Sequence, residues 1–440
     1  MRITGIMTYP DDRIKSIMLL VVYAVMLLYP ITMFIQKEIK TEYFAVLLFL
    51  SLYGFLSGRI KPSQYSLDRS DYLVLLSFAL ITIIAWVSYA HFGFQDYAKH
   101  RVEKYTWFLL AIPVYYLFLY TKPRMEVVWA GVVLGCFVAF SRAMLEEFSL
   151  VDEITWAGLQ GRANGSMHPI RFGDLSLLMG CIALNGSVNL SKLNSFLRLI
   201  GLVGFFAALE ASILSESRGG WISLPLLIAI IIWFKLQRSG VRKNIILLFS
   251  ILLIGIVVAI LTNDAAQNRI DMAIKGVKAY VAEGDNRSNA GARLDMYKTA
   301  CSAFLEHPLF GVGVGGYHLY SKDFSKIFNE LNEKKISKEV VRWKNPHNEF
   351  LLHAATRGVV GLAALFLMMF AIVNSGYSGH KSANQEDVVF SSVNLILIAV
   401  GFSVFGLTIA LFEHKDFLIF FLIYVPLFLS RLSRNVSGCG

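Results

Sequence analysis

Residues 17–35 read IMLLVVYAVMLLYPITMFI and contain no charged residue. A helix needs about 20 apolar residues to cross roughly 30 Å of hydrocarbon, so this stretch predicts a membrane-spanning helix. It leads into residues 36–38 (QKE) without a small-residue cleavage site, and a second apolar run begins at residue 42. A removable signal peptide has a shorter apolar core followed by such a site. We therefore expect this run to remain as the first of several spans.

Apolar runs of this kind recur along the whole chain. Of its 440 residues, 56% are hydrophobic and 16% are charged, with a mean hydropathy of +0.57, whereas soluble domains carry about 25% charged residues. The apolar excess must face lipid, and we predict an all-α, polytopic membrane protein. The sequence indicates about twelve transmembrane helices, at residues 15–36, 42–57, 72–91, 105–120, 126–145, 172–188, 196–214, 219–235, 244–262, 350–374, 390–412 and 416–430.

The basic residues between the spans predict the orientation. Twelve spans place both termini on one side, and the tails and loops of that side hold seventeen Lys and Arg, against ten in the short loops opposite. Basic loops stay in the cytoplasm, so both termini are expected there. Because most of the net charge of +10 lies in such loops, we expect a lipid bilayer as partner and no nucleic acid.

One long polar segment interrupts the spans and divides the chain into three parts: residues 1–262, 263–347 and 348–440. The central part is predicted to lie outside the cytoplasm, since long segments translocate largely regardless of charge. Apolar residues at helical spacing indicate helices at 265–281 and 291–306, and 324–341 is a third, highly charged candidate. We therefore expect a helical loop domain.

A glycine run, residues 310–317 (FGVGVGGY), follows the second of these helices. The dinucleotide fingerprint needs G-x-G-x-x-G between a strand and a helix, and neither the spacing nor the preceding helix fits. No Lys-Ser or Lys-Thr follows, as a P-loop would require. The run predicts a tight turn that lets backbones pack closely. Binding of a phosphate by its backbone amides is the alternative reading.

Three arginines stand next to helix starts on the predicted outer side: Arg171 in 168–173 (HPIRFG), Arg218 in 215–221 (SESRGGW), and Arg293. Taken singly, each fits a charge that reaches from the membrane surface into water. Taken together they favour an anion site, because helix N-termini donate free N–H groups and Arg binds phosphate oxygens in pairs. A membrane-bound pyrophosphate would need such a group.

A histidine, His347, lies in residues 345–350 (NPHNEF), where the loop meets the tenth span. A single histidine is usually structural, but this one sits at the water–lipid boundary with Asn348 and Glu349 beside it to orient the ring. Imidazole can accept a proton at neutral pH. Further charged groups within spans, at Glu210, His353 and Arg357, indicate either a function or a paired partner.

The outer segments contain no cluster suited to a metal ion. There is no HExxH motif, the four cysteines lack metal-ligand spacing, and Asp295 and Glu306 are eleven residues apart on one helix. Arginines can neutralise a departing phosphate without a metal. The predicted chemistry therefore needs neither metal nor cofactor.

At these residues the chain resembles the O-antigen ligase and polymerase superfamily of bacterial membrane glycosyltransferases. The resemblance covers about 150 residues and rests on four blocks in a fixed order: 215–221, 293–297 (RLDMY), 307–315 (HPLFGVGVG) and 346–351 (PHNEFL), ending near Gly358 and Gly361. Each block alone is weak, whereas their order and context are specific. The earlier spans match only in topology.

The resemblance implies a fold of the GT-C type and a periplasmic active site in a bacterial inner membrane. It implies a donor glycan linked to undecaprenyl pyrophosphate and an acceptor hydroxyl on lipid A-core. Arg218 and Arg293 match the family's phosphate-engaging arginines, His347 matches its essential histidine, the presumed base, and Arg171 looks like a further donor contact. One direct displacement would then invert the anomeric configuration.

Other readings stay open at this point. An O-antigen polymerase and a protein O-oligosaccharyltransferase share these motifs, and the ligase is favoured by the Arg218, Arg293 and His347 arrangement with one loop of about 85 residues. A membrane transporter would also have many spans, but transporters often show internal repeats with interrupted helices. No such symmetry is visible here.

Overall fold

The computed structural model describes residues 10–36, 39–151, 161–238, 264–284, 286–322 and 343–433, and this part of the chain is helical without a strand. The helices that form the bundle are α1 (Pro10–Thr32), α2 (Lys40–Leu56), α3 (Arg69–His91), α4 (Asp96–Thr121), α5 (Met125–Glu147), α6 (Pro169–Asn189), α7 (Ser195–Leu214), α8 (Arg218–Arg238), α13 (Glu349–Ser382), α14 (Glu386–Phe405) and α15 (Lys415–Leu429). Together they cover eleven of the twelve predicted spans. The ninth, 244–262, lies outside the described residues.

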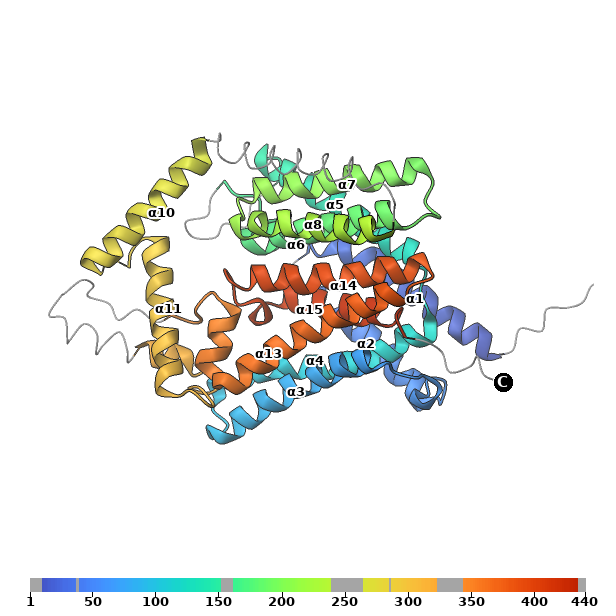
Figure 1. Cartoon of the computed structure of the whole chain (residues 1–440), viewed down its shortest axis with the longest axis horizontal. Helices are drawn as coiled ribbons and strands as arrows, with labels where there is room; N and C mark the ends of the chain where they lie inside the picture. The colour runs from blue at the N-terminus through green and yellow to red at the C-terminus, as the bar shows by residue number, and fades with distance from the viewer. Residues whose placement is uncertain are drawn as a thin grey trace, which may run out of the picture.

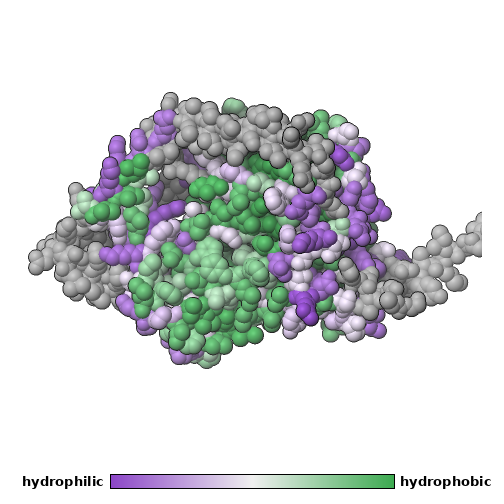
Figure 2. Space-filling view, viewed as in Figure 1, coloured by the Kyte–Doolittle hydropathy of each residue, from purple (hydrophilic) through white to green (hydrophobic). Residues whose placement is uncertain are grey.

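The surface of this bundle suits lipid. Seven of the described helices are long and apolar enough to cross a membrane by themselves: 13–32, 69–91, 125–147, 195–214, 219–237, 349–382 and 386–405. Figure 2 shows apolar residues gathered in a broad band between polar ends. Large apolar side chains such as Phe49, Ile222 and Phe370 are exposed there. Exposed apolar area of this kind indicates contact with lipid, and the chain is an all-α polytopic membrane protein.

The centre of the bundle is α15, whose side chains from Asp416 to Leu429 are all buried. A helix that is apolar on every side is stable only when other helices surround it, and α15 packs against α2, α4, α6, α13 and α14. Phe402 of α14 contacts the rings of Phe417, Phe420 and Phe421. This packing fixes the start of α15 in the middle of one end of the bundle.

Two helices of the long loop stand at that same end. They are α10 (Asp264–Glu283) and α11 (Asn289–Glu306), close to the two loop helices predicted from periodicity. Both lie away from the start of α1, which is at the opposite end of the bundle (Figure 1). The third predicted loop helix, 324–341, lies outside the described residues.

The glycine run forms the tight turn that the sequence predicts. Gly311, Gly313 and Gly315 all have positive φ, where glycine is favoured. A Cβ at Gly311 would lie 2.4 Å from the backbone nitrogen of Arg357. The turn therefore docks against α13 where that helix is broken at Gly358, with Val312 N donating to the Ala355 carbonyl at 2.9 Å.

One predicted span is too long at its end. The run 390–412 is apolar throughout, yet α14 stops at Phe405 and a 3-10 turn, η2 (Leu411–Glu413), precedes α15. The carbonyl of Gly406 accepts the backbone N–H of Glu349 at 2.7 Å. The helix ends early because this segment instead receives the start of α13.

Candidate functional site

The four residues singled out from the sequence all lie at the loop end of the bundle. Arg171 is in the first turn of α6, Arg218 is the first residue of α8, Arg293 is in the second turn of α11, and His347 directly precedes the N-cap of α13. The side chain of Arg218 lies outside the described residues, so only its backbone position is considered.

The starts of α6 and α8 are in direct contact. Ser217, the residue before Arg218, donates a hydrogen bond from its hydroxyl to Asp174 on α6. A Cβ at Gly173 would lie 2.0 Å from the Ser215 Oγ, so only glycine permits this approach. The α8 N-terminus therefore lies against the first turns of α6, which carry Arg171 and Asp174.

The loop helix α11 brings Arg293 to the same place. Tyr297, one turn later on the same face, donates to the Leu407 carbonyl at 3.1 Å, and Asn348 Nδ2 donates to that carbonyl at 3.2 Å. The charge of Arg293 acts on both Asp174 and His347. Within the described part of the chain, Arg293 has no hydrogen-bond or ion-pair partner, so its guanidinium is available to a ligand.

The backbone at His347 is held from several sides. Trp343 Nε1 donates to Asp295 at 2.7 Å, and Arg101 Nη2 donates to the Lys344 carbonyl at 3.0 Å. His347 itself has φ +47, in the left-handed region that side chains other than Asn, Asp and His rarely adopt. Such a conformation persists only when its surroundings enforce it, and it is common at functional sites.

The neighbours of His347 do not orient its ring as the sequence suggested. The side chain of Asn348 caps α13 by accepting from Leu351 N, besides its bond to Leu407. Glu349 instead pairs with His353 and accepts from Phe412 N. These two residues fix the start of the helix rather than the imidazole, which has no hydrogen-bond partner in the described part of the chain.

Three histidines at this end are held neutral by their surroundings. Burial and then the charge of Arg293 lower the pKa of His347 below its usual value. Burial and Arg171 lower the pKa of His168 to about 4, and they lower that of His414 to about 3 although Asp416 opposes this. A proton on His347 would raise the positive potential at both other rings. The three imidazoles therefore share one cationic environment and remain neutral at pH 7.

Arg171 faces a polar cavity of about 460 Å³, lined by Lys40, Thr41, Glu42, Ser166, Arg171, Glu413, His414, Lys415 and Asp416. Asp416 is paired with both Arg171 and Lys40, the second at 2.6 Å. Two cations thus share one buried carboxylate, while the lining as a whole holds three cations (Lys40, Arg171 and Lys415) and three carboxylates (Glu42, Glu413 and Asp416). Lys40 and Asp416 are 376 residues apart, and the sequence reasoning used Lys40 only for topology and missed Asp416.

Residues 203–366 match the model of the O-antigen ligase family. This stretch of the chain is similar to the O-antigen ligase family. A similar protein, an uncharacterized protein of Haemophilus influenzae (strain ATCC 51907 / DSM 11121 / KW20 / Rd), is 26% identical over 269 residues. That match spans 59% of this chain and 62% of the relative, less than two thirds of its length.

The matched stretch contains Arg218, Arg293 and His347, and the family model thus supports the resemblance drawn from their motifs. Arg171 and Asp416 lie outside the matched residues. Helices from beyond the matched stretch thus complete the cluster at this end of the bundle. Their contribution is visible only in the folded chain.

Two further charged or titratable residues of the matched stretch, Arg357 and His353, have partners inside the protein, whereas Glu210 does not among the described residues. Arg357 lies 4.0 Å from the Tyr105 ring centroid and contacts His353, which in turn pairs with Glu349 at 3.1 Å. This buried chain of contacts accounts for charges within the tenth span. Glu210 is exposed and pairs with no described arginine, so the partner suggested for it is not found in that part of the chain.

Acidic and cysteine residues do not assemble a metal centre in the described ranges. No three His, Cys, Asp or Glu side chains there are placed to hold a metal ion. Asp295, considered with Glu306 from the sequence, accepts from Trp343, Tyr280 and Asn286. Its role is to attach the end of the loop to α11.

Proposed function

We propose that this protein is an O-antigen ligase that transfers a glycan from undecaprenyl pyrophosphate to a sugar hydroxyl of lipid A-core, at the periplasmic face of the inner membrane. The observation that carries the proposal is the position of the neutral His347 ring within reach of the charge of Arg293, where neither side chain has a hydrogen-bond partner among the residues that the structure describes. A base and a phosphate-binding group are thereby provided within one site. The family match to residues 203–366 supports the same class of reaction.

Arg293, Arg218 and Arg171 are proposed to bind the donor pyrophosphate. The N-termini of α6 and α8 add positive dipole ends, although the Ile170 N–H of α6 already donates to His168 and the Gly220 N–H of α8 to Asp174. The interaction of these groups with the phosphate becomes strongest when its oxygen takes up negative charge during bond cleavage. Catalysis requires such an interaction, stronger in the transition state than in the bound donor. Arg171 is already paired with Asp416, so it contributes positive potential more than a free fork of donors.

His347 is proposed as the general base. Its ring nitrogen accepts the proton of the acceptor hydroxyl while that oxygen forms a bond to the anomeric carbon. The bond from this carbon to the pyrophosphate oxygen breaks, and its electron pair leaves with the pyrophosphate. One displacement without a protein nucleophile inverts the anomeric configuration. Arginines take the charge-neutralising role, so the step is proposed to need no metal.

The test is reconstitution of the purified protein with a lipid-pyrophosphate glycan and rough lipopolysaccharide, with and without a chelator. Capped lipopolysaccharide formed in both conditions is the expected product. Longer lipid-linked chains would instead identify a polymerase, and glycosylated protein a protein transferase. Transport of the lipid without transfer would overturn the enzyme proposal.

Replacing His347 with Ala separates the base from binding. General base catalysis contributes about 10²–10⁴-fold, so turnover should fall by that order while donor affinity stays near that of the unaltered protein. His100→Ala is the matched control, since His100 is exposed and pairs only with Glu103. Wild-type turnover in His347→Ala would refute the assignment.

A further inference from the structure

The segment that ends α11 and leads into the glycine turn exposes a short apolar surface. All six residues of 305–310 (LEHPLF) are exposed, and we call them the loop tip. Leu305, Leu309 and Phe310 are 76%, 60% and 54% exposed. Neighbouring apolar side chains of this size, all exposed, mark a surface that contacts something other than water.

The loop tip lies against the ends of two membrane-spanning helices. The ring centroid of Phe310 is 6.0 Å from that of His91, the last residue of α3. The carbonyl of Pro308 accepts the backbone N–H of Val359 on α13 at 2.8 Å. The tip is therefore attached to α3 by a side chain and to α13 by its backbone.

The lengths of these two helices place the loop tip at the edge of the hydrocarbon layer. The 23 residues of α3 run from Arg69 to His91, and the stretch of α13 from Val359 to Lys381 has the same length. A helix of this length spans about 34 Å, against roughly 30 Å of hydrocarbon. Because a basic residue stands at the far end of each stretch, His91 and Val359 lie at the boundary on the loop side.

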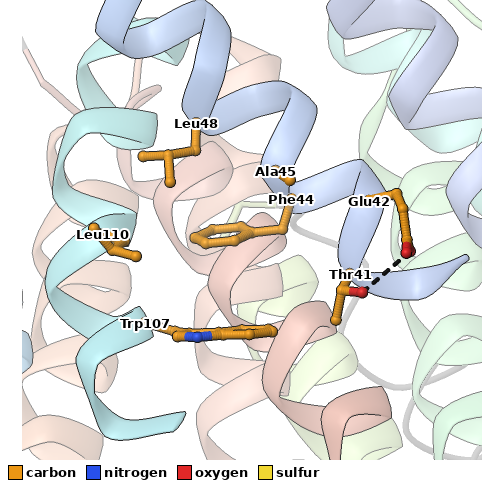
Figure 3. Close-up of a pocket in the computed structure, with 7 residues that line it drawn as sticks. All are labelled: Thr41, Glu42, Phe44, Ala45, Leu48, Trp107 and Leu110. Carbon is orange, nitrogen blue, oxygen red and sulfur yellow. Dashed lines mark hydrogen bonds between the residues drawn. The ribbon is translucent and has the colours of Figure 1, made fainter. Parts of the chain in front are cut away.

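Aromatic side chains mark the same boundary on the neighbouring helices. Trp86 of α3 is 43% exposed and donates to Thr106 Oγ1 of α4 at 2.9 Å. The next residue, Trp107, stacks on Phe44 of α2 with ring centroids 6.1 Å apart, and Figure 3 shows the two rings facing each other. Tryptophan is enriched where hydrocarbon meets water. His91, which touches the tip, lies about 7 Å beyond Trp86 along α3, within a head-group layer that is about 5–7 Å thick.

The apolar surface of the loop tip continues the lipid-facing surface of the bundle. Val87 on α3 is 57% exposed, and Val359 and Val360 on α13 are 47% and 37% exposed. The two helices pack against each other, so these side chains and the tip form one surface. Lipid that covers the helices at this level also reaches the tip, whereas a soluble partner would have to bind partly within the bilayer.

We propose that the loop tip inserts into the head-group layer of the leaflet on the loop side, with Leu305, Leu309 and Phe310 directed at the acyl chains. Its partner is phospholipid, which binds apolar side chains at the interface in proportion to the area they bury. The insertion holds α11 at the end opposite Arg293 and so sets the height of that arginine above the bilayer. The inference does not depend on the reaction that the protein catalyses.

A nitroxide label on Leu309→Cys tests the insertion in proteoliposomes. Cys301, which is exposed, and Cys439 are first replaced by serine, and the other two cysteines are buried. Lys298→Cys is the matched control, because Lys298 is exposed on the same helix before the tip. Oxygen concentrates in hydrocarbon and a nickel chelate stays in water, so the two relaxation agents report the depth of each label.

The label at position 309 should relax more with oxygen than with nickel, and the label at position 298 should show the reverse. A preference for nickel at both positions would overturn the inference. Shielding from both agents, with spin–spin broadening between labels, would show that a second copy covers the tip and would overturn it as well.

Hydrogen exchange provides a measurement without a label. In bilayers, Leu309→Asp should raise the exchange of residues 305–310 about tenfold, the factor that corresponds to the lost burial of a leucine side chain. Val281→Asp is the control, since Val281 is an apolar residue of α10 that is 78% exposed and lies outside the tip. Equal exchange in both variants would refute the insertion, and equal unfolding temperatures in detergent show that both are folded.

Discussion

Arg101 on α4 is predicted to position His347, the proposed general base, without touching the substrate. Its guanidinium pairs with Glu413 at 3.0 Å and donates to the carbonyls of Gly315 at 3.1 Å and Lys344 at 3.0 Å. It thus joins the glycine turn, the segment before His347 and the turn before α15. The side chain is only 17% exposed.

Arg101→Ala removes all three bonds at once. Hydrogen bonds to charged groups contribute about 1.5–3 kcal/mol each, but the bond to the Lys344 carbonyl is exposed and the other two are only partly buried, so we expect a loss of roughly 2–4 kcal/mol. This loss of free energy weakens the attachment of the loop to the bundle, because Arg101 does not take part in the bundle core. A displacement of about 1 Å in a reacting group can cost 10²-fold in rate, so kcat should fall about ten- to a hundredfold.

The assay is steady-state glycan transfer, with hydrogen exchange measured over residues 343–349. A positioning role predicts a fall in kcat with little change in KM for the donor, together with faster exchange in that segment. Arg101→Lys keeps the charge but lacks a fork that spans three acceptors, so it should recover activity only in part. Lys99→Ala, an exposed cation two residues earlier, is the control. Wild-type kcat and exchange in Arg101→Ala would refute the reasoning.

Three further predictions follow from single groups. Because burial and Arg293 keep the pKa of His347 below about 6.5, kcat/KM should be level from pH 7 upward and fall in more acidic solution; a profile that rises on acidification would contradict a neutral base. Asp416→Asn removes the carboxylate that Lys40 and Arg171 share. The free energy of unfolding, measured by chemical denaturation, should fall by about 3–5 kcal/mol. An unchanged midpoint of the denaturation curve would refute this. Gly311→Ala should lower the unfolding temperature more than Gly58→Ala does. Both replacements add about 1–2 kcal/mol of left-handed strain, but only Gly311→Ala adds a clash with the backbone of α13, since Gly58 has φ +68 and open space around it. Equal unfolding temperatures would disprove that the glycine turn docks against α13.

The helices were predictable because hydrocarbon imposes a single requirement on every span. Length and apolarity located eleven of the twelve predicted spans within described helices. The end of α14 was not predictable, because residues 406–412 are as apolar as the helix before them. Their carbonyls accept from Glu349, Tyr297 and Asn348, and such distant donors leave no trace in local hydropathy.

Short motifs were enough to single out two residues that the structure places at one end of the bundle, and their chemistry stays a prediction. His347 and Arg293 stood in recognisable blocks, and both reach the same end of the bundle. The Lys40, Arg171 and Asp416 cluster was missed because its members come from three helices far apart in sequence. A signal did exist: Asp416 and Glu413 are carboxylates at the predicted outer end of a span, where a carboxylate is stable only beside cations.

The carboxylates in this cluster explain how it stays assembled without a ligand. Like charges repel in a space of low dielectric. Asp416 and Glu413 offset the repulsion among the surrounding cations and keep them in fixed positions. The cations nevertheless outnumber the carboxylates by two, before Arg293 is counted: Lys40, Arg101, Lys104, Arg171 and Lys415 against Glu42, Glu413 and Asp416. A pyrophosphate diester would meet groups already in place, and the pyrophosphate released from it carries a further negative charge. Under the proposed function, this surplus would stabilise the departing group more than the bound donor, and so would lower the barrier instead of only tightening the donor complex.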